Sequence, residues 1–522
     1  MSAPQTAVAI PFSAPVKGMN TRDPLPLMDP LYAPLISGFE PYPQSLKVRN
    51  GHIFHIDHSV EFTPASSQRM RGLDLSPLGD KLIAWFYDSA NPKILDVSTA
   101  GAVTTIKDFG TITPVSNVGS THHAGNLFFG QDVVSGGVQS GRYDGSTWTN
   151  WGFTDGSSAI YSDVLLSYKG RLYIFPRSSS VDTYYSTIGG LTGACTAWAT
   201  GSLLPREKTV WWAGVLAAPS GQTNETYLVF GNQVGDVLVY AGDYPGAANW
   251  EQVAKATISY IPYQNACLQY NNDLLVVTTT GVVSIRKLLQ LGGDSPDIYI
   301  SSAINSYITT LFSGINAVDY ASAPVQIGYW SQRNQIYILT SSTVDTNGVF
   351  DEEGTTLLVW NEISDAWTIS QITPSASHAY AECYGKIVNF AGSLYYISRY
   401  DIKKVGTGFK DQTATATFSA YDINLQSAYT SLGSTNRYKK IASIEPIINT
   451  DFAADKVGVQ VSSDFGRKTS DVSYVSILQS GFNLPTYNLG IQGTYLQYRF
   501  TGSSDTSATN GYEIFSIGIS IK

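Results

Sequence analysis

The side chains that could carry chemistry in this sequence form no recognised catalytic pattern. The 522-residue chain contains no HExxH zinc motif, no GxSxG nucleophile elbow and no phosphate-binding P-loop. His52, His55 and His58 are three residues apart, and in a strand this spacing points successive side chains to opposite faces. We therefore expect neither a metal nor another cofactor. We expect all six histidines to be surface or strand-packing residues, which adds His122, His123 and His378 to these three.

The carboxylates do not suggest a glycosidase, which needs two of them in one concave, partly desolvated site. Asp351, Glu352 and Glu353 lie between Gly348 and Gly354, in a segment typical of a solvated turn. Residues 462–466 (SSDFG) are similar to the start of a sialidase Asp-box, but Lys-Thr follows where Thr-Trp is expected, and an Asx-type turn explains them. Residues 142–148 carry Asp-Gly between strand-like flanks, which also predicts a turn. The sequence predicts a protein that is not an enzyme.

Composition favours short strands joined by tight turns. Only 14% of residues are charged, whereas 12% are aromatic and 47 are glycine. The chain has 32 Lys and Arg against 41 Asp and Glu, a net charge of −9. Tight binding to nucleic acid needs the opposite balance, because cationic side chains must displace the counterions of the phosphates.

Cysteine usage and the N-terminus indicate assembly in a reducing cytoplasm. Cys195, Cys267 and Cys383 are too few and too scattered for a disulfide framework, so we expect all three to remain thiols. Residues 1–16 have no basic start, and three prolines interrupt their apolar residues, unlike a secretory signal. No stretch approaches the roughly 20 apolar residues that a membrane span needs.

A short unit recurs seven times: a turn of small or polar residues, then Leu or Ile, then large apolar residues. Successive Leu or Ile positions are separated by 45, 45, 56, 46, 62 and 58 residues. Four-stranded propeller blades repeat every ~40–50 residues, with longer intervals where loops are inserted. We predict an all-β fold with a β-propeller over 55–405, of six to seven blades and most simply seven, against the alternative of stacked sandwiches. The marker residues are Leu82, Leu127, Leu172, Leu228, Leu274, Ile336 and Leu394.

One amphipathic helix is predicted inside the propeller, near residues 296–314. Apolar residues recur there at helical spacing, a serine at 301 or 302 can cap the start, and Gly314 can end it. Such a helix can either dock a neighbouring subunit or pack on its own sheet. The candidate interface residues are Ile300, Ile304, Tyr307, Ile308, Leu311 and Phe312.

The repeat stops after residue 405, and the remaining sequence alternates polar and apolar residues between Gly, Ser, Asn and Asp turns. This pattern predicts an antiparallel β-sandwich over 406–522. Residues 1–54 differ from both regions: Gly18 permits a sharp bend, Asn20 and Asp23 can cap backbone N–H groups, and prolines impose an extended path. We predict an extended arm there, ending in a first strand.

The arm resembles the start of the tail nozzle, or tail hub, proteins of short-tailed bacteriophages. That family opens with a Gly-Leu-Asn-Thr-Arg-Asp-Pro-like segment, a Met-x-Pro turn, a Phe-Pro step and a Leu-x-Leu-Arg-x-Gly strand. Residues 18–24 (GMNTRDP), 28–30, 39–41 and 46–51 are similar to these elements, although Glu40 separates Phe39 from Pro41. Residues 284–290, which lead to the predicted helix, resemble the mid-chain insertion of the family, and 493–500 with 512–514 resemble the end of its sandwich.

The resemblance implies a structural virion protein without catalytic residues. Six copies would form a ring that extends the portal and adaptor channel, with tail fibres or tailspikes nearby. The ring would retain genomic DNA, which passes through it during ejection without specific binding, and it would be assembled in the host cytoplasm. Independently of the family, an acidic wall suits a conduit because it repels phosphates. Two alternatives remain: a propeller that binds or cleaves glycans of the host surface, and a cellular scaffold that binds proteins through its rim.

Overall fold

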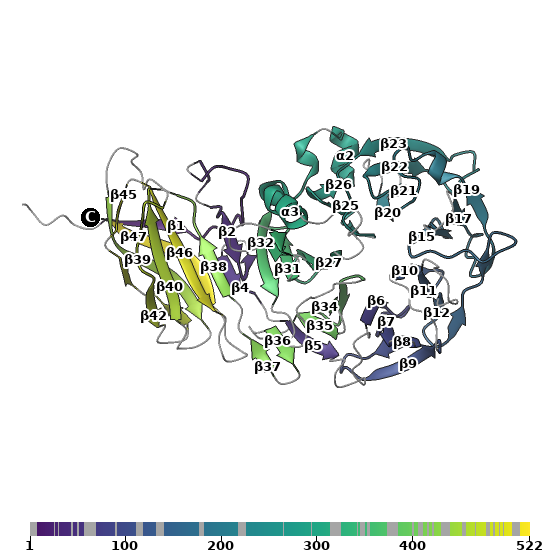
Figure 1. Ribbon diagram of the computed structural model, residues 1–522, viewed down its shortest axis with the longest axis horizontal. Helices are drawn as coiled ribbons and strands as arrows, with labels where there is room; N and C mark the ends of the chain where they lie inside the picture. The colour runs from purple at the N-terminus through teal and green to yellow at the C-terminus, as the bar shows by residue number, and fades with distance from the viewer. Residues whose placement is uncertain are drawn as a thin grey trace, which may run out of the picture.

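A computed structural model describes residues 8–521 except 26, 30, 43–44, 50–51, 57–68, 89–90, 111–117, 132–139, 177–181, 218–225, 265, 294, 314–324, 342, 345–349, 352–354, 373–384, 399–400, 406–410, 415–416, 420–421, 430–438, 451–455, 465, 477–480, 484–485, 490, 494 and 504–511. Two bodies lie side by side, a ring of small sheets and a sandwich that contains the C-terminal strand (Figure 1).

The ring is a β-propeller of small antiparallel sheets that follow the chain order, which confirms the predicted fold class. Five blades are separate four-stranded sheets, a sixth blade of four strands forms one end of a larger sheet, and another has three strands in the part of the chain that the structure describes, so the predicted range of six to seven blades holds. The sheets consist of β6–β9 (Arg69–Leu75, Leu82–Asp88, Asn91–Val97, Val103–Asp108), β10–β13 (Val118–His123, Asn126–Gln131, Gly141–Tyr143, Trp148–Asn150), β15, β16, β17 and β19 (Leu165–Tyr168, Arg171–Ile174, Thr183–Tyr185, Thr196–Trp198), β20–β23 (Trp212–Ala217, Thr226–Gly231, Asp236–Ala241, Glu251–Thr257), the three-stranded β24–β26 (Cys267–Tyr270, Asp273–Thr278, Gly281–Ser284), β27, β28, β31 and β32 (Val325–Trp330, Gln335–Thr340, Thr355–Asn361, Ala366–Ile372), and β33, β34, β35 and β5 (Val388–Phe390, Ser393–Ser398, Asp401–Val405, His52–Ile56).

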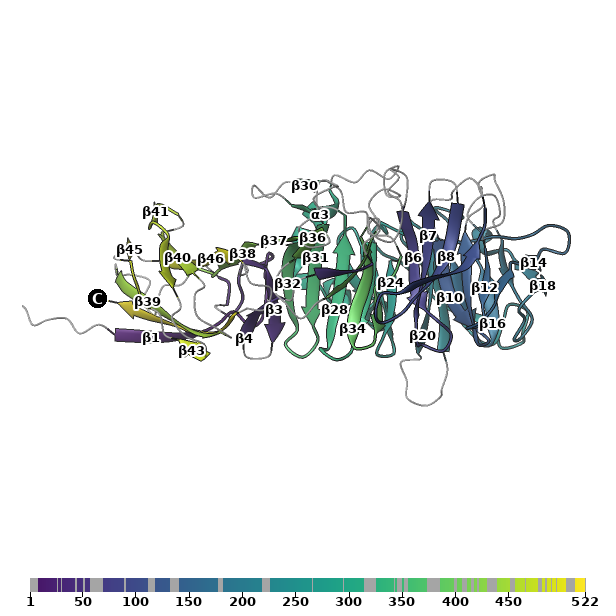
Figure 2. The same ribbon diagram turned by 90° about the horizontal axis from the view of Figure 1, so that it is seen from below.

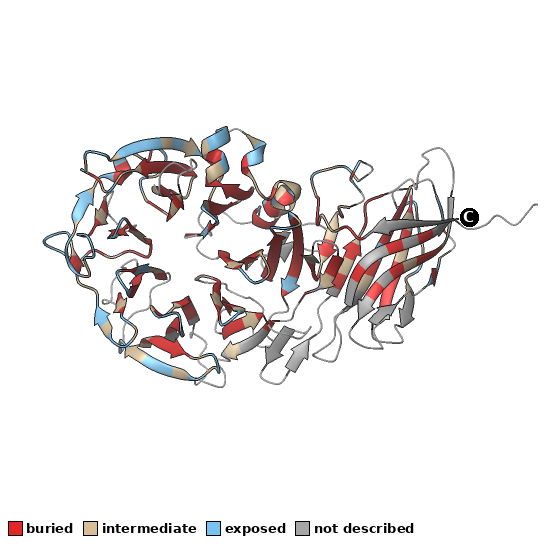
Figure 3. Cartoon of the chain, turned by 180° about the vertical axis from the view of Figure 1, so that it is seen from behind, coloured by how far each residue is buried: buried red, intermediate tan, exposed pale blue. Residues whose placement is uncertain are grey.

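The recurring sequence unit is the first hairpin of each blade. Four of these turns have two successive residues with positive φ, as in Lys169 (46°) and Gly170 (72°), the conformation of the two-residue turns that suit twisted hairpins. The strand after the turn carries the marker Leu or Ile, and all seven markers are buried. Viewed from the side, the blades stand upright and next to one another (Figure 2). Buried residues gather on inner strands, whereas outer strands such as β9 and β23 are largely exposed (Figure 3).

The N-terminal strand β5 closes the ring by pairing with β35 as the outer strand of the last blade. The two strands come from positions about 350 residues apart, for example His52 opposite Val405. This closure removes the free edge that an open ring would leave.

The three-stranded blade is completed by helical segments: α2 (Ile285–Leu291), the 3-10 turns η2 (Pro296–Ile298) and η3 (Ser302–Ile304), and α3 (Asn305–Phe312). The expectation of a single helix near 296–314 is therefore corrected, because α2 precedes it and α3 starts only at Asn305. Asp273 and the Ser284 side chain satisfy the free N–H groups at the start of α2, a long-range cap that helical periodicity does not reveal.

The second body is a sandwich of two mainly antiparallel sheets, as predicted. One sheet consists of β38 (Asp422–Gln426), β46 (Leu496–Ser503), β40 (Lys456–Ser463), β41 (Lys468–Thr469) and β42 (Ser473–Ser476). The other joins β47 (Tyr512–Ile521) to β39 (Lys439–Thr450), with β43 (Gly481–Asn483), β44 (Tyr487–Asn488) and β45 (Gln492–Gly493) beside β39. Smaller pairs are β14 (Phe153–Thr154) with β18 (Gly193–Ala194), β29 (Thr343–Val344) with β30 (Phe350–Asp351), and β36 (Asp411–Ala414) with β37 (Thr417–Ser419).

The N-terminal arm takes part in both bodies. Strand β1 (Val8–Ser13) pairs with β47, and the hairpin of β3 (Phe39–Tyr42) and β4 (Ser45–Val48) adds to the same sheet. Strand β2 (Leu35–Ser37) lies between β32 of the propeller and β38 of the sandwich, so a ten-stranded sheet runs from one body into the other. The predicted boundaries at residues 54 and 405 stay predictions, because the arm supplies strands to both bodies.

Candidate functional site

The arm motif lies against the propeller at its junction with the sandwich. Gly18 has a φ of +82° and bridges to Trp367 of β32, and the Met19 N–H donates to the Trp367 carbonyl at 2.7 Å. A Cβ on Gly18 would lie 2.5 Å from the Trp367 nitrogen, closer than real atoms approach. Glycine is therefore required both for its backbone conformation and for this close approach.

The Asn20 side chain stabilises the next turn through hydrogen bonds. Its Oδ1 accepts hydrogen bonds from the N–H groups of Arg22 (2.9 Å) and Asp23 (3.1 Å), and its Nδ2 donates to the Asp23 carboxylate (2.8 Å). Arg22 Nε donates to the same carboxylate at 3.1 Å. These bonds from Arg22 and Asn20 lower the pKa of Asp23. The predicted capping role of Asn20 is confirmed, whereas Asp23 acts as an acceptor for side chains.

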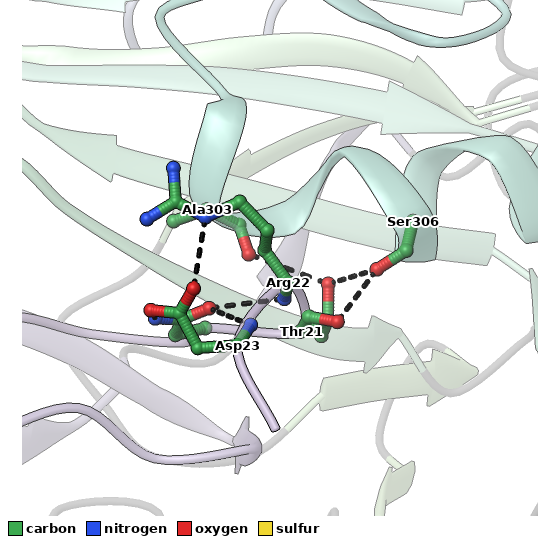
Figure 4. A network of polar contacts seen from close by, with 6 residues as sticks. Thr21, Arg22, Asp23, Ala303 and Ser306 are labelled. Carbon is green, nitrogen blue, oxygen red and sulfur yellow. Dashed lines mark hydrogen bonds and ion pairs between the residues drawn. The ribbon is translucent and has the colours of Figure 1, made fainter. Parts of the chain in front are cut away.

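Thr21 ties the arm to the helical insertion (Figure 4). Its N–H donates to the Ala303 carbonyl at 2.7 Å, and Ser306 of α3 donates to the Thr21 carbonyl at 3.0 Å and also contacts the Thr21 hydroxyl. Trp367, 1% exposed, completes the link, because its indole N–H donates to the Ile300 carbonyl at 3.1 Å. Arm, insertion and blade are thus joined around one tryptophan.

The predicted interface residues of the insertion pack within the chain. Ile304, Ile308, Leu311 and Phe312 are buried in the large core cluster, and Ile300 and Tyr307 pack against it while partly buried. The sequence left open whether this apolar face docks a neighbouring subunit or packs on its own chain. In the structure it packs on its own chain. Docking of a subunit through these six side chains stays a prediction, and their burial within the chain does not support it.

A buried ion pair fastens the β3 hairpin to the propeller. Arg333, in the turn after β27, donates through Nη1 to Glu40 at 2.6 Å, and the Tyr337 hydroxyl donates to the same carboxylate at 3.1 Å. Burial alone would lower the pKa of Arg333, but Glu40 outweighs it and raises that pKa. Glu40, the residue that interrupts the Phe-Pro step of the resembled family, thus has a structural role.

The end of the same hairpin, directly after β4, is fixed by a second buried cation. Arg49 is 1% exposed and donates through Nε to the Ser370 hydroxyl at 2.6 Å and through Nη2 to the Gln371 carbonyl at 3.2 Å. Both acceptors belong to β32. The Arg of the Leu-x-Val-Arg segment therefore holds the sandwich side of the arm against the blade.

A second polar cluster lies near the centre of the ring, between β6, β10 and the segment before β33. Lys386 donates to the Asp74 carboxylate at 2.9 Å and to the Ser120 carbonyl at 2.7 Å, and the Ser120 hydroxyl donates to Asp74 at 2.6 Å. His122 Nε2 lies 3.5 Å from the other Asp74 oxygen. Burial alone would raise the pKa of Asp74, but Lys386, His122 and Ser120 outweigh it and hold that pKa far below its usual range.

This cluster leaves little open space. Ser120 and Lys386 line a cavity of about 20 Å³ together with Gly72, Gly119 and Gln264, enough for roughly one water molecule. The Gln264 Oε1 is buried and, among the described residues, has no hydrogen-bond partner. This cavity is thus polar and has room for a water molecule but not for a large ligand.

The cluster lacks the geometry of a catalytic triad. In a triad the nucleophile contacts the base and the base contacts the carboxylate, whereas Ser120 and His122 both approach Asp74 directly. A carboxylate with a strongly lowered pKa is also unsuited to act as a general acid. Sequence reasoning missed this cluster because its members come from three blades and belong to no motif.

The remaining candidate residues have structural roles where they are described. His52 contacts the Tyr396 hydroxyl at 2.7 Å, His55 contacts the Ser98 carbonyl, and His123 contacts the Ser167 hydroxyl. The described residues contain no group of three or more His, Cys, Asp or Glu that could hold a metal. His58, His378, Glu352, Glu353 and Cys383 lie outside the described residues.

Two predicted turns differ in detail. Asp144 accepts hydrogen bonds from the N–H groups of Ser146 and Thr147, which confirms a turn in 142–148. Asp464 lies in the hairpin between β40 and β41 with a φ of 47°, and its carboxylate accepts a hydrogen bond from the distant Tyr495 N–H. Cys195 and Cys267 are free thiols, and burial raises the pKa of each to about 12. No helix among the described residues is long and apolar enough to cross a membrane.

Comparison with known proteins adds no family. No family model and no curated protein matches the chain. Among solved structures, an exo-β-1,3-galactanase of Phanerochaete chrysosporium with galactose covers 81% of this chain and 98% of its own length at 8% identity and a TM-score of 0.25. A variant of that enzyme with β-1,3-galactotriose covers 81% and 97% at 9% identity and a TM-score of 0.26. The N-terminal domain of Nup159 covers 72% and 97% at 9% identity and a TM-score of 0.36. Similarity this low carries no argument about function.

Proposed function

We propose that this chain is the tail nozzle subunit of a short-tailed bacteriophage. Copies of it, six by resemblance, form a ring that extends the portal and adaptor channel. The ring retains the genome in the capsid and conducts it during ejection. The protein has a structural role and catalyses no reaction.

One observation carries the proposal: the arm, which resembles the opening of the nozzle family, contacts the mid-chain helical segment and pairs with the end of the sandwich. Thr21 of the opening motif binds Ala303 and Ser306, which lie in the helical segment that follows the insertion-like residues 284–290. Leu46 of the arm strand pairs with Ile514 of the sandwich end. Residues that meet in this way serve one architectural purpose, which supports a family relationship more strongly than separate short motifs do.

The charge distribution agrees with a conduit. Residues 55–405 contain 29 Asp and Glu against 19 Lys and Arg, whereas the rest of the chain is nearly neutral, with 12 against 13. Six copies at −9 each would carry −54, a charge that must be spread over lumen and exterior for the ring to assemble. An acidic wall repels the phosphates and lets the duplex slide.

Electron cryomicroscopy of the intact virion tests the proposal. We expect density for this chain as a closed ring between the adaptor and the tip of the tail. Absence from the particle, a single peripheral copy, a fibre, or a ring whose lumen is lined mainly by Lys and Arg would overturn it. Release of sugar from host polysaccharide by the purified protein, lost when a propeller carboxylate is mutated, would favour the glycan-cleaving alternative instead.

A further inference from the structure

The tip of the arm exposes apolar residues beside a cation. Leu27 is 79% exposed, Pro24 is exposed and Leu25 is half-buried. The Arg22 side chain is 63% exposed, and its two terminal nitrogens point away from Asp23 (Figure 4). A small apolar centre with an arginine at its edge is the composition of protein interfaces.

The described residues of the tip are also fixed to the rest of the arm by hydrogen bonds and by one buried side chain. Met28, 4% exposed, anchors it from below, and the Leu27 N–H donates to the Pro24 carbonyl at 2.9 Å. On the far side, Asp29 accepts from the Leu31 N–H at 2.9 Å and from Lys17 at 3.0 Å. Because the tip is already ordered, binding through it would cost little conformational entropy.

We propose that this tip, Arg22–Leu25 together with Leu27, is a docking surface for a second copy of the chain. The inference rests on the proposed ring, and it names the part of the arm that reaches the neighbour. Leu27 and Pro24 would be buried against the neighbour, and Arg22 would pair with carboxylates of its propeller.

Charge complementarity selects this partner. The propeller segment has ten more acidic than basic residues, whereas the tip presents an arginine whose guanidinium is oriented by Asp23. Planar guanidinium groups bind carboxylates in pairs of hydrogen bonds, and Arg is enriched among the residues that dominate binding energy. Contact between tip and propeller also joins two different surfaces, as the closure of a ring requires.

The test compares self-association of full-length variants by sedimentation velocity over a concentration series. The double variant R22E/L27D removes both contacts, and L27D alone keeps the Arg22–Asp23 pair. The matched control is R467E/L78D, because Arg467 is exposed and Leu78 is 75% exposed, but both lie outside the arm. Circular dichroism and melting temperature show that each variant is folded.

We expect concentration-dependent association of the wild-type chain that weakens with salt, at least about tenfold weaker association of R22E/L27D, a smaller loss for L27D, and no change in the control. Equal association of R22E/L27D and wild type, or a wild-type chain that stays monomeric throughout, would overturn the inference. Loss of duplex binding, measured by fluorescence anisotropy, with unchanged self-association would assign the tip to phosphate instead. Imaging of the virion decides the ring itself, so the proposed function can survive failure of this inference.

Discussion

Replacing Gly18 by Ala would test whether the arm motif is built for close backbone approach. The new Cβ would lie 2.5 Å from the nitrogen and 2.6 Å from the oxygen of Trp367, both backbone atoms that cannot rotate away. The residue must also keep a φ of +82°, which alanine adopts only at a cost. We expect the arm to separate from β32 more often in this variant, while the rest of the propeller stays folded.

The free-energy cost of Gly18→Ala for arm docking has two contributions. A non-glycine residue in the left-handed region costs roughly 1–2 kcal/mol. Crowding of a packed site costs about 1–3 kcal/mol more, since either the arm or β32 must shift. The total of about 2–5 kcal/mol corresponds to a ~30-fold or greater increase in local opening, because each 1.4 kcal/mol is a factor of about ten.

Amide hydrogen exchange measures this opening, because the N–H groups of Met19 and Thr21 are bonded to Trp367 and Ala303 only while the arm is docked. Gly79→Ala is the matched control: its φ is +71°, but its Cβ would meet nothing within 4 Å, so it carries the conformational cost alone. The free-energy costs of the two variants should differ by the contribution of crowding, about 1–3 kcal/mol. Unchanged protection of Met19 and Thr21 in Gly18→Ala would refute the argument.

Three further predictions concern buried charges and thiols. Glu40→Gln leaves the largely buried Arg333 without its carboxylate, and we expect a loss of about 3–5 kcal/mol of unfolding free energy in denaturant titration; a loss below about 1 kcal/mol would mean that the pair is well solvated. Folding lowers the pKa of Asp74, so this carboxyl adds stability above its ordinary pKa of 3.8 and loses that contribution as the pH falls below it. The melting temperature of Asp74→Asn should therefore depend less on pH than that of the wild type between about pH 5 and pH 2. Equal pH dependence of the two melting temperatures would contradict this. Burial raises the pKa of Cys195 and Cys267 to about 12, so both should resist iodoacetamide at neutral pH in native protein and react after unfolding, as mass spectrometry can count; rapid native labelling of either would exclude a buried thiol.

The propeller could be predicted because its signal is local and repeated. Each first hairpin needs a turn with positive φ followed by a buried strand, so small or polar residues precede Leu or Ile in the sequence itself, as at Lys169, Gly170 and Leu172. The helix α3 was predicted on similar grounds, from apolar spacing at Ile308 and Leu311. Its neighbour α2 was missed, because seven residues are too few for a clear periodicity.

The paths of the arm could not be predicted, because its partners are distant in sequence. Strand β1 pairs with β47, more than 500 residues later, and nothing in the pattern of either strand specifies the other. The same holds for the central cluster, where Asp74 and Lys386 are 312 residues apart. Sequence motifs singled out Gly18 and Asn20 correctly, but only the fold shows that Gly18 contacts Trp367 and that the neighbouring Thr21 contacts Ser306.

The junction also limits how the subunit can move. Domains of one chain usually shift relative to each other unless their interface is large. Here a bend between propeller and sandwich would break the pairing of β2 with β32 and β38 and would separate Glu40 from Arg333. Breaking such a buried ion pair alone costs several kcal/mol. We therefore expect the two bodies to move as one, so that in the proposed ring any opening of the channel would occur between subunits rather than at a hinge within the chain.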